Sequence, residues 1–288
     1  MFELFNLWQV NTILTIIFFV AYSQFYRLVA RNSKDVSSVV IIIFIIASIT
    51  FALFIPFFEI KFPSDWHLYI WLLLAIVFYA INDKLKSIGY KHLDISIISI
   101  MTQLSKVFLV VIGVLFFKES VEANELFGVV LILTGGVLVV FRKGAFVINK
   151  YIWVMIAAAV AVAIALSIDV GISAQFNLAI YLVAVSIFPV FLIFLTERKS
   201  VDDLKKEFYR SNKKRRWYFI LAGVGIALAS LTYLGALRQG QVSVVAPLTS
   251  LVVVVNTAIG YIFLKEKNAL IKRLIASLLV VMGVFLLI

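Results

Sequence analysis

The sequence predicts an all-α membrane protein with ten transmembrane helices in two inverted five-helix repeats. Three observations predict this fold. First, 64% of the 288 residues are apolar, well above the roughly 45–50% of soluble domains. Second, the apolar residues gather in ten runs, each close to the about 20 residues that cross a bilayer core. Third, features of the first half recur 147 residues later.

The ten runs are the expected helices, in chain order. The first run is interpreted as a mature helix because no basic start or small-residue cleavage site accompanies it. Helices are expected throughout because lipid offers no partner to an open strand edge, and the runs lack the alternation of a membrane barrel. Their bounds are 7–26, 36–58, 66–88, 95–117, 123–141, 151–172, 178–196, 217–237, 241–264 and 270–288.

The two halves share sequence at a fixed offset. The segment Phe116-Phe117-Lys118-Glu119 recurs as Phe263-Leu264-Lys265-Glu266, each time at the end of an apolar helix. The expected repeats are residues 1–145 and 146–288. Because each repeat has an odd number of helices, the second inserts upside down relative to the first, and such inverted repeats are typical of transporters.

Basic residues predict the orientation. The net charge is +11, and 22 of the 26 Lys and Arg residues fall in alternate loops. By the positive-inside rule these loops are cytoplasmic, which places both termini outside a cell (inner or plasma) membrane. The charge is thus a topology signal, and we expect no nucleic-acid partner.

The long basic connection 197–216 has two readings. Val201, Leu204 and Phe208 follow helical spacing, so a short amphipathic helix could lie on the anionic leaflet. The simpler reading is a solvated basic loop that fixes orientation.

Lys106 is the most informative single candidate for a functional residue. It lies midway along the run 95–117, too deep for its side chain to reach the interface. A charge there costs several kcal/mol unless it is paired or hydrated. The functional reading is a cation facing a substrate cavity. The alternatives are a structural lysine, paired or neutral, or a misplaced helix boundary.

Polar residues form stripes on two helices that are equivalent in the repeats. Ser96, Ser99, Gln103 and Lys106 share one face of the fourth helix. The ninth helix carries Ser243, Ser250, and Asn256 or Thr257. Facing stripes would line a hydrophilic pathway, whereas hydrogen bonds between helices are the competing explanation.

Further cavity candidates lie in other helices. Asp83 and Asp169 are potential proton carriers or counter-ions to Lys106, with an interfacial structural carboxylate as the alternative for each. The remaining candidates are Tyr22, Gln24, Tyr79, Asn82 and Tyr233.

Enzyme signatures are absent from the sequence. It has no phosphate-binding loop, His-Glu-x-x-His motif or nucleophile elbow, and no cysteine. We therefore expect neither catalysis nor a cofactor or metal. Thr134-Gly135-Gly136 is interpreted as a small-residue packing notch.

The chain resembles the drug/metabolite transporter superfamily, EamA type. The resemblance covers nearly the whole chain and is carried best by SIGYKHLDISIISIMTQLSKVFLVVIGVLFFKESV (87–121) and GALRQGQVSVVAPLTSLVVVVNTAIGYIFLKEK (235–267). It implies a central cavity between the first, third, fourth, sixth, eighth and ninth helices, with access alternating as the repeats rock. Carried over by position, it places Gln103, Lys106, Ser243, Thr249 and Ser250 at the cavity.

Two departures separate the chain from the family pattern. Lys106 stands where the family often has proline, and Ala21-Tyr22-Ser23-Gln24 stands where Trp-Gly is usual. The identity of the substrate therefore cannot be inferred from relatives. Family members also commonly have cytoplasmic termini, opposite to the orientation that the charges predict here.

The expected function is secondary transport, with export favoured, of a small polar or amphipathic metabolite by alternating access. The alternative is a non-transporting assembly or sensor protein with the same fold. A channel suits ten short-looped helices less well. Expected partners are a small-molecule substrate and the lipid bilayer, with a coupling proton and a homodimer as options.

Overall fold

A bundle of long helices makes up the protein in a computed structural model. The structure describes residues 7–286 except 32, 59–61, 118–121, 143–144, 147–148, 210–211, 240–244, 246–247 and 264–269. The two strands β1 (Phe141–Arg142) and β2 (Ala145–Phe146) pair antiparallel in a short ladder. The predicted all-helical fold is therefore confirmed, with this small ladder added.

Most of the described helices lie in the predicted apolar runs, whereas α9 lies in a predicted connection and much of 241–251 lies outside the described residues. Short 3-10 turns, η2 (Ile55–Phe57) and η3 (Ser173–Gln175), follow α2 and α7. The α-helices are α1 (Trp8–Arg31), α2 (Val36–Phe54), α3 (His67–His92), α4 (Ile95–Thr102), α5 (Leu104–Phe117), α6 (Ala123–Val140), α7 (Lys150–Ile172), α8 (Leu178–Thr196), α9 (Val201–Tyr209), α10 (Lys213–Gln239), α12 (Val252–Phe263) and α13 (Leu270–Leu286).

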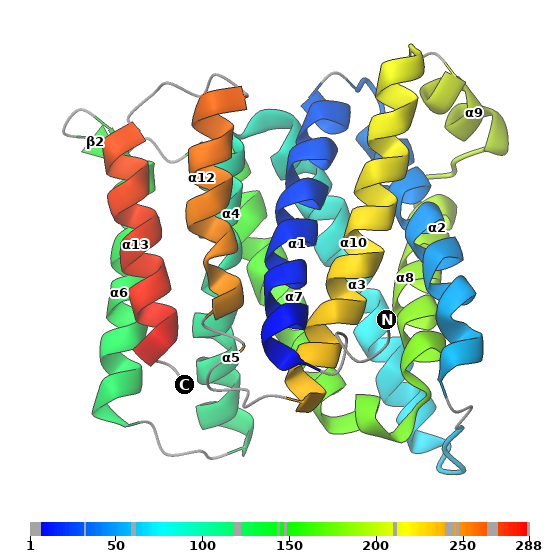
Figure 1. Ribbon diagram of the computed structural model, residues 1–288, viewed down its shortest axis with the longest axis horizontal. Helices are drawn as coiled ribbons and strands as arrows, with labels where there is room; N and C mark the ends of the chain where they lie inside the picture. The colour runs from blue at the N-terminus through cyan, green and yellow to red at the C-terminus, as the bar shows by residue number, and fades with distance from the viewer. Residues whose placement is uncertain are drawn as a thin grey trace.

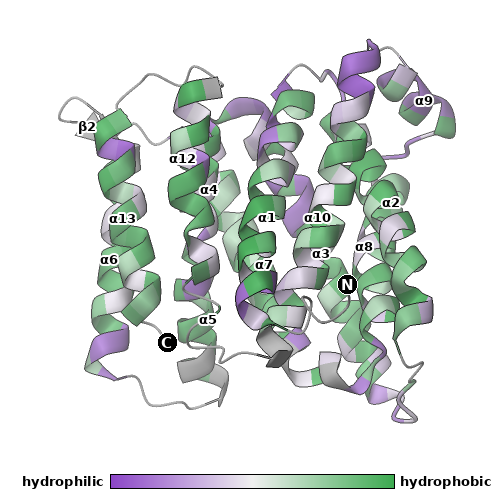
Figure 2. Cartoon of the chain, viewed as in Figure 1, coloured by the Kyte–Doolittle hydropathy of each residue, from purple (hydrophilic) through white to green (hydrophobic). Residues whose placement is uncertain are grey.

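Several of these helices could span a membrane. Within the described residues, seven are long and apolar enough to cross a bilayer, and two shorter apolar helices cover Ala123–Leu138 and Leu248–Ile262. Green apolar residues dominate the long helices, and purple residues gather at the end that carries α9 (Figure 2). Apolar side chains such as Leu53, Leu115 and Ile271 are exposed on the outside, as expected of a surface that faces lipid.

The principal helix pairs each join the two halves of the chain. α1 packs on α10, α3 on α7, α2 on α8, α6 on α13 and α4 on α12 (Figure 1). The largest apolar cluster draws residues from both halves, among them Tyr26, Ile98, Met155 and Val253. The two halves therefore share one core.

Several helix ends and two predicted helices differ from the sequence prediction; the second of these helices is the run 241–264, which breaks at Leu251. α1 continues to Arg31 and α3 to His92, so basic residues assigned to loops lie in helical turns instead. The run 95–117, predicted as one helix, divides into α4 and α5 at Gln103. This division is a correction to the predicted element.

The connection 197–216 contains the helix α9. Leu204 and Phe208 pack against the central apolar cluster, and Glu207 is buried with its carboxylate 2.5 Å from Arg215 Nη2. These side chains therefore face the bundle. The simple loop interpretation is wrong for residues 201–209, and Leu204 and Phe208 of the apolar face contact protein, whereas Val201 is exposed.

The predicted packing notch is confirmed at Gly135. A Cβ atom at this position would lie 2.6 Å from Val280 Cγ2 and 2.8 Å from Ala276 O. Gly283 makes the reciprocal approach, since its Cβ would lie 2.6 Å from Gly128 O. Small residues thus let α6 and α13 approach closely, as in other helix pairs within membranes.

Candidate functional site

Three predicted site residues meet inside the bundle. Gln24 Nε2 donates a hydrogen bond to Asn256 Oδ1 over 3.0 Å, and Asn256 Nδ2 donates to Ser99 Oγ over 2.9 Å. Gln24 comes from α1, Ser99 from α4 and Asn256 from α12, and all three are buried. We call this set the polar junction. It connects the first and second halves of the chain through polar atoms.

The helix break at Gln103 lies one turn beyond Ser99. Gln103 N donates to Ile100 O and Lys106 N to Gln103 O, both with the tighter i to i−3 pattern. Two hydroxyls satisfy carbonyls at the break: Thr102 Oγ1 donates to Ser99 O over 2.9 Å, and Ser105 Oγ donates to Thr102 O over 2.8 Å. The neighbouring Thr and Ser side chains therefore support the discontinuity.

A second break lies in the other half of the chain. A turn at Leu251 separates the helical residues 248–250 from α12, and Leu251 N donates to Leu248 O over 3.1 Å. In the alignment with a 147-residue offset, Gln103 matches Ser250, so the breaks fall one residue apart. Thr249 is half-buried and Ser250 is buried at this break. Ser243 lies outside the described residues.

Unsatisfied polar atoms lie beside the junction and the break. Gln24 Oε1 and Gln103 Oε1 are buried and accept no hydrogen bond within the described part of the chain. Lys106 is half-buried and forms no described ion pair, either with Asp83 or with Asp169. Buried polar atoms without partners cost stability, so these groups are candidates to bind a ligand.

Asp169 has a different environment. Its carboxylate accepts hydrogen bonds from the hydroxyls of Tyr79 and Tyr181, one on each oxygen. Tyr79 comes from α3, Asp169 from α7 and Tyr181 from α8. The structure thus joins two predicted site residues, Tyr79 and Asp169, and adds Tyr181. Sequence reasoning missed Tyr181, although a tyrosine inside an apolar run was a visible signal.

The other predicted residues are distributed around the bundle. Tyr22 belongs to a buried aromatic cluster with Tyr26 and Tyr90, and Lys86 Nζ lies 5.7 Å from the centroid of the Tyr22 ring. Asn82 Nδ2 donates to Asp83 Oδ1 over 2.9 Å. Tyr233 makes an edge contact with Phe19, 6.4 Å between ring centroids. No described hydrogen bond joins Tyr22, Asn82 or Tyr233 to the polar junction.

Sequence reasoning also missed two buried arginines. Arg273 Nη2 lies 2.5 Å from Asp94 Oδ2, and Arg273 Nη1 donates to Ser96 Oγ over 2.8 Å. Arg27 Nη2 lies 3.7 Å from the other oxygen of Asp94. In the count of basic residues that predicted the orientation, both arginines were assigned to loops. The position of Arg273 one turn inside α13 could have indicated a buried partner.

Metal ligands do not cluster in the described residues. Among the described residues, there is no group of three or more His, Cys, Asp or Glu side chains that could hold a metal ion. The hydrogen bonds described at the polar junction and the helix break come from amides and hydroxyls, and Lys106 lies one turn beyond Gln103.

Comparison with known proteins identifies the family. The model of the EamA-like transporter family matches twice, over residues 6–141 and over residues 147–288. The chain belongs to the EamA-like transporter family. As a member with multiple apolar helices, it is a multi-pass membrane protein of a transporter family rather than an enzyme family.

The fold of this EamA-like protein also occurs in a solved structure. One protein crystal structure has a TM-score of 0.66 with it at 13% sequence identity, covering 96% of this chain and 94% of the other. At that identity the likeness shows the fold alone. No curated protein sequence matches this EamA-like chain.

Proposed function

We propose that this EamA-like protein is a secondary transporter that exports a small polar or amphipathic metabolite by alternating access. The observation that carries the proposal is the polar junction, in which Gln24 and Ser99 contact Asn256 across the two halves of the chain. Transporters of this kind bind substrate near the bilayer midplane, between repeats and beside discontinuous helices.

The proposed architecture is ten helices in two inverted repeats, residues 1–145 and 146–288. The helix pairing supports it, because exchanging the halves converts the α1–α10 pair into the α7–α3 pair. The matched helix breaks at Gln103 and Leu251 support it as well. Under this proposal the basic loops are cytoplasmic and both termini lie outside a cell membrane.

The proposed substrate contacts follow from the unsatisfied atoms. Lys106 is a cation without a described ion pair, so it would attract an anionic or zwitterionic group in a medium of low dielectric constant. Gln24 Oε1 and Gln103 Oε1 accept no described hydrogen bond and would accept one from an N–H or O–H of the substrate. A proton could drive this export, and Asp169 is a candidate to carry it.

Metabolite profiling tests the proposed function. Cells that overproduce the protein should accumulate at least one small polar compound in the medium, whereas cells without it should retain that compound. Reconstituted vesicles should then exchange the same compound. If profiles are identical and vesicles show no flux across a broad metabolite panel, a non-transporting assembly or sensor role replaces this proposal.

A further inference from the structure

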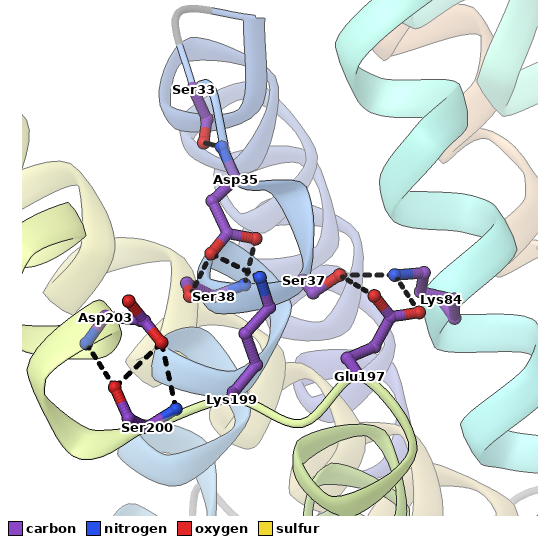
Figure 3. Close-up of polar contacts among 9 residues, drawn as sticks. All are labelled: Ser33, Asp35, Ser37, Ser38, Lys84, Glu197, Lys199, Ser200 and Asp203. Atoms are coloured by element: carbon purple, nitrogen blue, oxygen red, sulfur yellow. Dashed lines mark hydrogen bonds and ion pairs between the residues drawn. The ribbon is translucent and has the colours of Figure 1, made fainter.

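Two ion pairs connect the halves of the chain at one end of the bundle. Lys199 Nζ lies 2.7 Å from Asp35 Oδ2, and Lys84 Nζ lies 2.7 Å from Glu197 Oε1 (Figure 3). Ser37 hydrogen-bonds to both Lys84 and Glu197. We call these two pairs the latch, and the end of the bundle that carries them the basic end, at the top of Figure 1 beside α9.

Local structure positions Asp35 on one side of the latch. It is the N-cap of α2, and its carboxylate accepts hydrogen bonds from Ser38 N over 3.2 Å and Ser38 Oγ over 2.6 Å. Burial alone would raise the pKa of Asp35, but hydrogen bonds from Lys199 and Ser38 outweigh it and hold the pKa below its ordinary value. The carboxylate therefore stays charged beside Lys199.

A left-handed residue positions the other side. Arg198 has a φ of 49°, and Lys199 N donates back to Phe194 O over 3.0 Å, as in a helix-terminating Schellman motif. This turn directs Glu197 toward Lys84 and Lys199 toward Asp35 (Figure 3). A non-glycine residue rarely adopts such a φ, so the surrounding contacts must stabilise it.

At the opposite end of the same two helices, no such ion pair is described between them, and Glu59 and Lys61, which follow α2, lie outside the described residues. α2 and α8 are both 19 residues long. Whereas α2 begins at Asp35, α8 begins at the uncharged N-cap Asn177. Whereas α8 leads into Glu197 and Lys199, α2 leads into the apolar turn Ile55–Phe57. The ion pairs between halves that the structure describes, including Arg273–Asp94, all lie at the basic end.

We propose that the latch is a gate contact, which holds the halves together at the basic end and opens whenever the central region is exposed there. This proposal rests on the proposed transport function. Opening that end by rocking the halves apart would separate Asp35 from Lys199 and Lys84 from Glu197. Because partly exposed ion pairs contribute modestly, breaking each should favour the open state about two- to fivefold.

A single reporter thiol tests the latch directly. The chain contains no cysteine, so Ser99→Cys introduces one reactive group into the buried polar junction. A membrane-impermeant maleimide is applied to sealed vesicles of each orientation, and the labelling rate is measured without any substrate. The test variant is Asp35→Asn with Glu197→Gln. The matched control is Asp65→Asn, which alters an exposed local pair with His67 outside the latch.

The expected result is faster labelling from the basic end in the test variant, by about two- to fivefold per pair, with no change in the control. The charge-swapped variant Asp35→Lys with Lys199→Asp should return the rate toward that of the unmodified latch. An unchanged rate in a folded test variant, or a folded charge swap that labels as fast as the broken latch, overturns the proposal. If the thiol introduced by Ser99→Cys reacts from neither side of the membrane in any variant, that result contradicts the proposed transport function itself.

Discussion

Asn256 and Ser99 are hydrogen-bonded over 2.9 Å although 157 positions separate them in the sequence. Gln24 extends the same chain of hydrogen bonds from α1. An amide at position 256 can donate to one neighbour and accept from the other, which an aliphatic side chain cannot do. The polar junction therefore requires a side chain at position 256 that can both donate and accept a hydrogen bond.

Replacing Asn256 by leucine should destabilise the protein. The variant removes both hydrogen bonds and leaves Gln24 and Ser99 buried without this partner. Because hydrogen bonds within membranes average about 0.6 kcal/mol, we expect a loss of roughly 1–2 kcal/mol. Unfolding in mixed detergent micelles measures it. Thr134→Ala, which removes an exposed hydroxyl bonded only to Val130 O among described groups, should be neutral. Equal stability of Asn256→Leu and wild type would contradict the described junction.

The hydroxyls of Tyr79 and Tyr181, which donate hydrogen bonds to the Asp169 carboxylate, should each contribute to stability. Tyr79→Phe leaves the carboxylate with Tyr181 alone among its described hydroxyl donors. We expect a loss of about 1–2 kcal/mol, because hydrogen bonds to a charged group are stronger than neutral ones. The control is Tyr69→Phe on the same helix, whose exposed hydroxyl donates to Pro63 O. Indistinguishable unfolding of the two variants would refute this assignment.

A methyl group at Gly135 should disturb the contact between α6 and α13. Gly135→Ala places Cβ 2.6 Å from Val280 Cγ2 and 2.8 Å from a backbone oxygen, so the helices must separate. We expect a loss of roughly 1–3 kcal/mol. Gly171→Ala is the matched control, because its Cβ would meet nothing within 4 Å. That change should instead be neutral or stabilising, by at most about 1 kcal/mol. Thermal unfolding of both variants provides the comparison.

Acid should weaken the contact between Asp35 and Lys199. The pKa of Asp35 in the folded protein lies below its ordinary value of 3.8. Its stabilising contribution is therefore present above pH 3.8 and is lost as the pH falls through the folded pKa. Melting temperatures measured from neutral pH to below pH 3.8 should fall more steeply for wild type than for Asp35→Asn. Parallel curves would contradict the role of Asp35.

The membrane fold could be predicted from the sequence because bilayer thickness imposes a length on every apolar run. Lys106 and Asp169 could be singled out as candidate site residues because a charge is conspicuous among apolar neighbours. The break at Gln103 could not be predicted, since neither glycine nor proline marks it. Its support comes from the hydroxyls of Thr102 and Ser105, which are ordinary residues in such a run.

The repeat placed Ser99 and Asn256 on facing stripes, and the structure joins them by a hydrogen bond, but most other contacts between distant segments were beyond sequence reasoning. Periodicity places Gln24 and Asn256 on helices but gives no information on which helices pack together. The latch depends on the left-handed turn at Arg198, for which the sequence shows no glycine or asparagine. Tyr22 could be singled out as a cavity candidate, but periodicity gave no sign that it would be buried in an aromatic cluster with Tyr26 and Tyr90.

The central claim is that Lys106 and the helix break beside it lie on the transport path. The most direct measurement compares Lys106→Met with Lys34→Met, a change of the same type at an exposed loop position, using vesicles and the compound identified by metabolite profiling. Methionine keeps most of the side-chain length and removes the charge. We expect Lys106→Met to insert and fold normally but to lose transport of that compound or change specificity, whereas Lys34→Met transports normally. Wild-type transport by a well-folded Lys106→Met variant would contradict the account.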